Sequence, residues 1–243
     1  MKTIARKTIV IVGATGGIGR VLAQMYVDAG YNVVLVARRL EKLQELEVQL
    51  DANGHVLVLP ADASDPKQVE QVLRKAKRHF GRIDVVVISA GSWARLSINS
   101  RVREASSLAR AHFESLFLPG FVVGYAAQQF FRKSEKGKGL IINISSHAAL
   151  LPKLPGNLTY GPMKAAIRHF MLALRHEVRG TKIRIVDIAP AIVNTPEAQK
   201  ILNTPKKRRK AVQPETMGRW TLKHLDDPKI PKSKRFKSSL VVA

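Results

Sequence analysis

Cysteine is absent from the 243 residues of this sequence, which excludes disulfide bonds and thiolate metal ligands. Its seven histidines show no His-Glu-x-x-His motif or comparable ligand spacing, so metal-free chemistry is expected. Long hydrophobic runs are absent as well: after the basic residues 1–7, the apolar run Thr8–Val12 ends at a glycine turn. Because no run reaches the length that spans a membrane, we predict a cytoplasmic protein without a membrane span.

Acidic residues are scarce. There are 18 Asp and Glu against 41 Lys and Arg, which gives a formal net charge of +23. Residues 1–196 carry 28 basic and 14 acidic residues, and the last 47 residues carry 13 and 4. Such a charge attracts nucleic acid, anionic surfaces or anionic metabolites. Because the excess runs along the whole chain, a general charge property is the simpler interpretation, and binding of nucleic acid or an anionic surface is the alternative.

Hydrophobic residues make up 45% of the sequence, which is typical of a globular protein with a sizeable core. Mostly apolar, β-rich runs alternate with helical patterns, as expected for strands covered on both faces. They lie at residues 8–12, 33–37, 55–59, 84–88, 140–144, 183–188 and 239–242. This alternation predicts an α/β fold with a doubly wound parallel sheet of about seven strands, the Rossmann fold. We expect one Rossmann-fold domain over residues 1–243, with a basic segment at about 196–238.

The first predicted strand leads into a turn with glycines at positions 13, 17 and 19. In a tight turn between a strand and a helix, glycines leave backbone N–H groups and the positive helix end open to a phosphate. Gly13 allows the turn, Gly17 lets a pyrophosphate approach, and Gly19 lets the helix pack on its strand. With Thr15 and Ile18 between them, these glycines predict a dinucleotide-binding site.

The end of the second strand predicts which dinucleotide binds. Residue 37 is Ala, where an acidic residue would bind the adenosine ribose and favour NAD(H). Arg38 and Arg39 follow, and their guanidinium groups suit a 2′-phosphate. NADP(H) is therefore the preferred cofactor and NAD(H) the alternative. Two surface arginines at the start of a helix are the competing structural explanation.

Two further turns follow predicted strands at the same edge of the sheet. After the third strand, Asp65 and Pro66 predict the N-cap and first residue of a helix. Asp62 is not needed for that cap, so its carboxylate, next to Ala63, is free to accept a hydrogen bond from an adenine amino group. The turn after the fourth strand lets a cofactor lie against its backbone because its residues are small: Ser89, Ala90 and Gly91.

A serine, a tyrosine and a lysine predict the reacting centre. Ser146 follows the fifth strand, and Tyr160 and Lys164 open a helix expected to run to Val178. Because positions four apart share a helix face, the phenol and the ammonium point into the same cleft. A nearby cation lowers a tyrosine pKa toward neutrality, which suits acid–base catalysis on an alcohol or carbonyl. Ser146 is placed to hydrogen-bond the substrate oxygen.

In this order along the chain, the glycine turn and the Ser-Tyr-Lys set resemble the short-chain dehydrogenase/reductases, over nearly the whole length from residue 8 to about 242. The resemblance implies hydride transfer between NAD(P)(H) and a carbonyl or alcohol. It implies that Tyr160 is the general acid/base, that Lys164 holds the nicotinamide ribose and lowers the Tyr160 pKa, and that Ser146 orients the carbonyl.

The resemblance also bears on two other regions. Residues 190–195 resemble the family's Pro-Gly-x-x-x-Thr segment, which implies that a backbone group of Ile192 and the Thr195 hydroxyl hold the nicotinamide carboxamide. It implies a homodimer or homotetramer that packs helices around residues 113–132 and 160–178. Pro119 and Gly120 are expected to kink or interrupt the helix before the fifth strand.

Several positions depart from the family pattern. Ser89 replaces the first Asn of the usual Asn-Ala-Gly, Ala191 replaces the Gly of Pro-Gly, and the gap from serine to tyrosine is one residue longer. The helical Asn that carries a water-linked proton relay aligns best with Leu116, which cannot relay protons. His147 is a candidate substitute in a relay, and a hydrogen-bonded loop histidine is the simpler interpretation.

Beyond Thr195 the sequence is less informative. Five consecutive cations run from Lys206 to Lys210, and three interpretations remain open: a solvated loop, a clamp for an anionic substrate, and contact with nucleic acid or a membrane surface. We predict an NADP(H)-preferring oxidoreductase that interconverts a carbonyl and a secondary alcohol of a small molecule. The alternative is a dinucleotide-sensing or nucleic-acid-associated protein with little turnover, which Leu116 and the basic charge favour.

Overall fold

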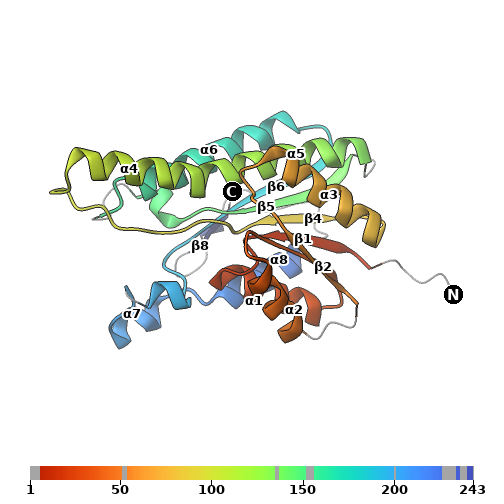
Figure 1. The fold of residues 1–243 in the computed structure, drawn as a ribbon, viewed down its shortest axis with the longest axis horizontal. Coiled ribbons are helices and arrows are strands. Elements are labelled where there is room, and N and C mark those ends of the chain that lie inside the picture. Colours follow the sequence, from red (N-terminus) through yellow and green to blue (C-terminus); the bar gives the residue numbers. More distant parts are fainter. Residues whose placement is uncertain are drawn as a thin grey trace.

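A central sheet runs through the molecule, with helices on both of its faces (Figure 1). The structure is a computed structural model and describes residues 6–50, 54–134, 137–151, 156–199, 201–225, 234–235 and 240–242. The strands within these residues are β1 (Thr8–Val12), β2 (Asn32–Ala37), β3 (Val56–Pro60), β4 (Val85–Ile88), β5 (Lys138–Ile144), β6 (Lys182–Pro190), β7 (Lys234–Arg235) and β8 (Leu240–Val242). Their order in the sheet is β3-β2-β1-β4-β5-β6-β8-β7.

The first six strands are parallel, which confirms the doubly wound fold. They are rich in valine and isoleucine, which suit a pleated surface buried on both faces. Every residue of β1 is buried, between β2 and β4. The seventh predicted strand corresponds to β8, which joins β6 antiparallel, with Val241 opposite Ala189. Position 239 of that prediction lies outside the described residues.

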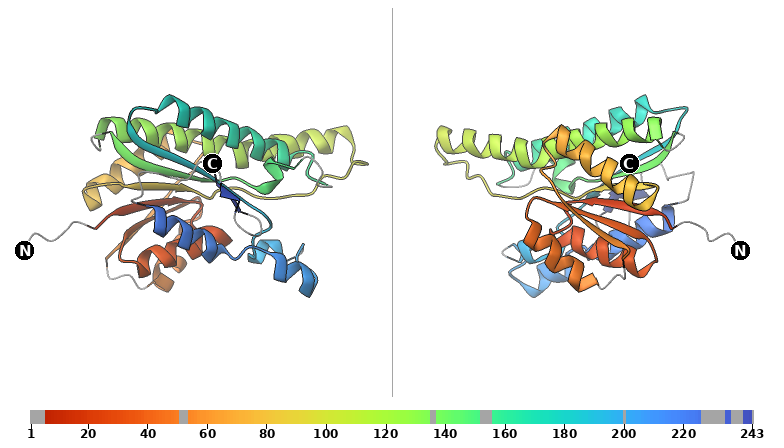
Figure 2. Two further views of the ribbon diagram at one scale, coloured as in Figure 1. Left: turned by 180° about the vertical axis from the view of Figure 1, so that it is seen from behind. Right: turned by 45° about the vertical axis from the view of Figure 1, so that its right-hand side comes forward.

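Two layers of helices cover the sheet (Figures 1 and 2). One layer contains α1 (Gly17–Asp28), α2 (Leu40–Leu50) and α8 (Pro214–His224), and the other contains α3 (Pro66–Phe80), α5 (Leu118–Ser134) and α6 (Tyr160–Glu177). The first layer packs on a core that includes Leu22, Leu35 and Trp220. The second packs on a core that includes Ile141 and Met171. The helices of both layers bury apolar stripes, which stabilises the fold mainly through removal of apolar surface from water.

The start of α3 shows how a local sequence pattern fixes a helix end. The Asp65 carboxylate accepts hydrogen bonds from the backbone N–H groups of Lys67, at 2.8 Å, and Gln68, at 3.3 Å. Pro66 occupies the first helical position, where a missing N–H costs nothing. The predicted N-cap is therefore confirmed, and the cap holds the turn after β3 in place.

The helix before β5 is interrupted before Leu118, and not at Pro119 and Gly120 as predicted, because those two residues lie within the first turn of α5. Helix α4 (Val102–His112) passes into one π-helical turn, η1 (Phe113–Phe117), and α5 begins at Leu118, directly before Pro119. A π turn contains one extra residue and is frequent at functional sites. Leu116 lies within this turn and is buried, with 3% of its surface exposed.

The carboxyl ends of β1 to β6 lie at the edge of the sheet toward which α4 and α7 (Pro205–Lys210) project (Figure 1). All predicted site residues follow strands at this edge or lie on α1 and α6. The residues of α7 from Lys206 to Lys210 are exposed. In the described part of the chain, no helix is long and apolar enough to cross a membrane, and no group of three or more His, Asp or Glu residues could hold a metal.

Candidate active site

The glycine turn between β1 and α1 is shaped by close backbone contacts. Gly13 has a φ of 85°, and a Cβ there would lie 2.6 Å from the backbone nitrogen of Ala90. A Cβ on Gly19 would lie 2.2 Å from the Gly13 carbonyl oxygen. Both positions therefore require glycine, because the opposing atoms belong to the backbone and cannot turn away. This is the tight turn and close strand–helix packing that the sequence predicts.

The start of α1 can receive a phosphate. The backbone N–H groups of Gly17, Ile18 and Gly19 have no hydrogen-bond partner among the described residues, as is usual for the first turn of a helix. N–H groups in this position are, together with the helix dipole, suited to bind an anion. Thr15 and Ile18 are partly buried in the same turn. The residues present therefore fit the pyrophosphate of a dinucleotide.

The segment after β6 reaches this turn. A Cβ on Gly17 would lie 2.5 Å from the Thr195 Cβ and 2.7 Å from the Glu197 carboxylate oxygen Oε2, so both side chains lie against the first residue of α1. Thr195, which is predicted to hold the nicotinamide carboxamide, thus lies against the glycine turn. Glu197 was not expected there. Its side chain is exposed, and its negative charge would repel a phosphate placed at the start of α1.

The adenosine end of the predicted site lies after β2 and β3. Arg38 and Arg39 are exposed, and the Arg38 charge is close enough to Asp62 to help hold the pKa of that carboxyl below its usual value. The main cause of this low pKa is Ser64, whose hydroxyl and backbone N–H donate to Asp62 Oδ1 at 2.7 and 2.9 Å. Oδ1 is therefore used within the turn. Oδ2 accepts no hydrogen bond among the described residues and suits the predicted adenine contact, beside the buried Ala63.

The turn after β4 packs against the glycine turn and approaches Lys164. The Ser89 hydroxyl donates to the carbonyl oxygens of Val12, at 3.0 Å, and Gly13, at 3.4 Å, and so ties β4 to the glycine turn. Ala90 contacts Gly13, as described above. Gly91, with a φ of 146°, approaches the centre of the site: a Cβ there would lie 3.5 Å from the Lys164 Nζ. The expected small-residue turn thus joins the glycine turn to the catalytic helix.

Ser146 lies close enough to Tyr160 for its hydroxyl to lower the pKa of the phenol. Ser146 precedes the short helix η2 (His147–Ala149), and its Oγ also accepts from the Ala148 N–H at 3.2 Å. Tyr160 is the first residue of α6. Burial raises the Tyr160 pKa, and the hydrogen bond with Ser146 opposes this effect. The predicted lowering of the Tyr160 pKa by Lys164 is therefore wrong for this structure, because desolvation of the phenolate is the larger effect.

Lys164 is buried, with 6% of its surface exposed, and its Nζ lies 6.0 Å from the centre of the Tyr160 ring. The ammonium donates to the carbonyl oxygen of Ile144 at 3.0 Å. Burial lowers the Lys164 pKa to about 8, and the negative charge of Asp187 opposes the shift. The helix therefore brings Tyr160 and Lys164 to one side, as the four-residue spacing predicts.

Leu116 is at the centre of the site. Its Cδ2 would lie 2.7 Å from a Cβ on Gly91, which also faces Lys164. An apolar side chain therefore occupies this place, in agreement with the position predicted for the missing relay residue. His147, the other candidate for a relay, is a partly buried residue of η2 and makes no side-chain hydrogen bond among the described residues.

The segment that follows β6 contains the other predicted cofactor contacts. Ile192 is 46% exposed, and its carbonyl oxygen accepts from the Val212 N–H at 2.9 Å. Its N–H has no hydrogen-bond partner in the described part of the chain. The N–H is therefore the backbone group of Ile192 that can donate a hydrogen bond to a carboxamide oxygen. Thr195 begins η3 (Pro196–Ala198) as its N-cap residue.

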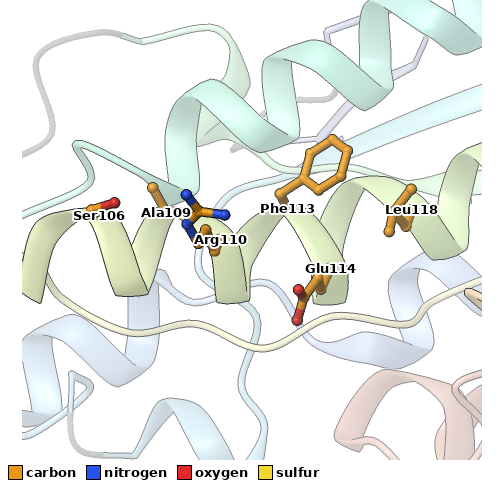
Figure 3. Close-up of a pocket in the computed structure, with 6 residues that line it drawn as sticks. All are labelled: Ser106, Ala109, Arg110, Phe113, Glu114 and Leu118. Carbon is orange, nitrogen blue, oxygen red and sulfur yellow. The ribbon is translucent and has the colours of Figure 1, made fainter.

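A hollow on the outer face of α4 and α5 is separate from this site (Figure 3). Its lining includes Arg110, Phe113 and Glu114, whose side chains are drawn in the close-up. It contains none of the predicted catalytic or cofactor-binding residues.

Comparison with known proteins decides the class. Residues 7–206 match the family profile described as short chain dehydrogenase. The chain belongs to the short-chain dehydrogenase family. The predicted enzyme class, an oxidoreductase acting on CH–OH groups, is thereby confirmed. The matched range ends within α7, so the glycine turn and the Ser-Tyr-Lys set all lie inside it.

Two relatives and one solved structure show how similar this short-chain dehydrogenase is to others. The NADP-dependent 3-hydroxy acid dehydrogenase YdfG of Salmonella typhimurium is 32% identical over 197 residues, which cover 78% of this chain and 73% of that protein. Sulfoacetaldehyde reductase 2 of Chromohalobacter salexigens is 32% identical over 189 residues, which cover 77% and 73%. The structure of ElxO with NADP bound has a TM-score of 0.82 at 21% identity and covers 93% of this chain and 94% of that one, a likeness of fold.

Besides Glu197, two residues of the site were not found from the sequence. His112, at the end of α4, is 1% exposed, has its ring against that of Tyr160, and shares a 2.8 Å hydrogen bond with the Thr159 hydroxyl. Asp187, in β6, is 1% exposed. A lone acidic residue in an otherwise buried strand was a signal for Asp187, because such a charge needs partners. No sequence signal marks His112.

Proposed function

We propose that this protein is an NADP(H)-preferring oxidoreductase that reduces a carbonyl group of a small molecule and carries out the reverse oxidation. The observation that carries the proposal is the position of the Lys164 ammonium, 6.0 Å from the centre of the Tyr160 ring and near Ser146, at the sheet edge that holds the glycine turn. A bound nicotinamide supplies or accepts the hydride. The chain's own residues bind, orient and protonate the substrate.

In this proposal, Tyr160 donates its proton to the carbonyl oxygen while Ser146 hydrogen-bonds the same oxygen. A raised pKa keeps the phenol protonated at neutral pH, which suits the proton-donating direction, carbonyl reduction. Lys164 holds the nicotinamide ribose through its ammonium, and Gly91 leaves room for the cofactor beside it. Gly13, Thr15, Gly17, Ile18 and Gly19 receive the pyrophosphate.

Arg38 and Arg39 are proposed to select NADP(H) over NAD(H). If they bind the 2′-phosphate, replacing both with serine should weaken NADPH binding by about 30-fold, equivalent to about 2 kcal/mol, and leave NADH binding nearly unchanged. Fluorescence titration of the purified, nucleic-acid-free protein with each cofactor measures both constants. Replacing Arg74 and Arg78 of α3 with serine removes the same charge elsewhere and serves as the control. Equal loss for NADPH and NADH would contradict the assignment.

The substrate is proposed to carry an acidic group. Two relatives are named for a 3-hydroxy acid and for sulfoacetaldehyde. In this chain, the exposed Arg95 lies over Gly156, close to the start of α6: a Cβ on Gly156 would lie 2.8 Å from the Arg95 Nε. The Arg95 guanidinium has no hydrogen-bond partner among the described residues, so it is available to a carboxylate or sulfonate. The clamp interpretation of Lys206–Lys210 is compatible with the same substrates.

We propose a homodimer or homotetramer that uses the outer face of α5 and α6. Four rings stack at four-residue intervals along η1 and α5: Phe113, Phe117, Phe121 and Tyr125. Phe121 also contacts Phe170 of α6 at 4.7 Å between ring centres. Phe121 is 39% exposed and Tyr125 47%. Exposed aromatic rings in such a row are typical of an interface.

Replacing Phe121 with glutamate should therefore convert the assembly to monomers, because a buried, unpaired charge would lie between subunits. Light scattering at micromolar concentration measures the mass. The control is Val48 to glutamate, at a position 78% exposed on α2. A wild-type protein that is already monomeric would contradict the proposal.

A low-turnover dinucleotide sensor or nucleic-acid-associated protein is the second candidate. The buried, apolar Leu116 beside Lys164 and the exposed cations of α7 favour it. The placement of Tyr160 beside Lys164 opposes it, because a sensor has no use for a proton donor. Retention of nucleic acid that depends on salt and is lost when residues 206–210 are neutralised would support this candidate.

A further inference from the structure

A buried carboxylate lies behind the reacting centre, in the neighbouring strand. Asp187 is 1% exposed and stands opposite Asn143 in the register of β5 and β6. A carboxylate at such depth is stable only with hydrogen-bond donors and positive charge around it. Its partners therefore show what its charge holds together.

Three side chains donate hydrogen bonds to the two carboxylate oxygens of Asp187. Asn143 Nδ2 donates to Oδ1 at 2.6 Å, and Ser145 Oγ donates to Oδ2 at 2.7 Å. The Arg168 guanidinium, with a side chain 12% exposed, forms an ion pair with Oδ2. The carboxylate thus joins β6 to the end of β5 and to the catalytic helix α6.

These partners surround two groups on which catalysis depends. Asn143 and Ser145 flank Ile144, whose carbonyl oxygen accepts the 3.0 Å hydrogen bond from the Lys164 Nζ. Ser145 also directly precedes Ser146. Arg168 lies one helical turn after Lys164 and fixes the same face of α6. One carboxylate therefore sets both the acceptor of the Lys164 ammonium and the start of the Ser146 loop.

Asp187 supplies the negative charge that opposes loss of the Lys164 proton. Tyr160 and Arg168 belong to its own helix, and His112 of α4 packs against Tyr160. Asp187 of β6 is the negative charge that acts on Lys164. Without it, Arg168 would leave a second, unpaired cation near the buried ammonium, and both would favour loss of the Lys164 proton.

We propose that Asp187 is a positioning residue of this active site: it fixes the end of β5 against α6 and supplies the counter-charge that keeps Lys164 protonated. The inference rests on the proposed function for the consequences in turnover. Its effect on the Lys164 proton is a property of the chain alone and can be measured without cofactor or substrate.

The test begins with Asp187→Asn, which keeps the size of the side chain and removes its charge. The pKa of Lys164, about 8 in the wild type, should fall by about one unit. NMR titration of protein labelled with ¹³C at the lysine ε-carbons measures it, and Lys164→Met assigns the signal. With cofactor and substrate, kcat should fall at least tenfold at pH 8, and the alkaline limb of the NADPH-binding and kcat/KM profiles should move to lower pH.

Two further variants separate charge from folding. Asn143→Asp combined with Asp187→Asn moves the carboxylate across the strand pair, so the Lys164 pKa should return to within about half a unit of the wild type while kcat recovers in part. The control is Asp84→Asn, which removes another acid paired with an arginine, Arg82, at the opposite edge of the sheet. It should leave the Lys164 titration unchanged.

The outcomes are distinct. A folded Asp187→Asn protein with an unchanged Lys164 pKa overturns the inference, whether or not its thermal stability falls, because the carboxylate would then be only structural. If the single variant does not fold, the double variant decides: a Lys164 pKa lowered by a full unit there contradicts the counter-charge role. A wild-type protein that binds no NADPH refutes the proposed function instead, and the Lys164 titration still decides the inference.

Discussion

Replacing Tyr160 with phenylalanine is expected to lower kcat for carbonyl reduction by about 10²–10⁴-fold. The change removes one hydroxyl group, which is the proton donor, and keeps the ring that packs against His112. The dissociation constant of NADPH should change less than threefold, because the glycine turn and Arg38 are untouched. Steady-state kinetics and fluorescence titration on the same preparation measure the two effects.

The matched control is Tyr31→Phe. Tyr31 lies just before β2, at the opposite edge of the sheet from α6, and its ring contacts Tyr26. Loss of that hydroxyl should leave kcat within about twofold of the wild type. Turnover that survives Tyr160→Phe would show that another group supplies the proton, and the mechanism proposed here would be wrong.

Gly19→Ala is expected to abolish measurable NADPH binding and to destabilise the fold by about 3 kcal/mol. The added Cβ would lie 2.2 Å from the Gly13 carbonyl oxygen and 2.9 Å from the Ala14 Cα. Because both atoms belong to the backbone of the turn, α1 must move away from β1. The N–H groups at its start then lose their positions around the pyrophosphate.

Gly16→Ala in the same turn is the control, since its Cβ would meet only the Gly13 carbonyl oxygen at 3.4 Å and its φ is −76°. It should change the NADPH dissociation constant by less than about fivefold. Thermal unfolding and fluorescence titration report stability and binding separately. NADPH binding within threefold of the wild type in Gly19→Ala would mean that this turn does not hold the cofactor.

The parts of the fold that follow from local patterns could be predicted from the sequence. The apolar, β-branched runs gave the six parallel strands, and Asp65 with Pro66 gave the start of α3. The glycines of the first turn and the spacing of Tyr160 and Lys164 predicted which elements meet. These signals are local because one strand, one cap or one helix turn determines each of them.

The remaining features depend on contacts between distant segments. Burial of Tyr160 comes from packing of α4 and α6, so the direction of its pKa shift did not follow from the four-residue spacing. The same holds for the pairing of Asp187 with Arg168 and for Glu197 beside Gly17. The antiparallel direction of β8 is set by its pairing with β6, where Ile188 lies opposite Val242, a residue far away in the sequence.

The most direct test of the proposed activity is transfer of deuterium. The purified protein is incubated with NADPH deuterated at the transferable C4 position and with a panel of aldehydes and ketones that includes carboxylate- and sulfonate-bearing members. Mass spectrometry of the alcohols then reports whether the label moved. We predict one deuterium on the carbinol carbon of at least one product, with none when Tyr160 is replaced by phenylalanine. Tight NADPH binding with no labelled alcohol from any member would contradict the oxidoreductase proposal and favour a dinucleotide sensor.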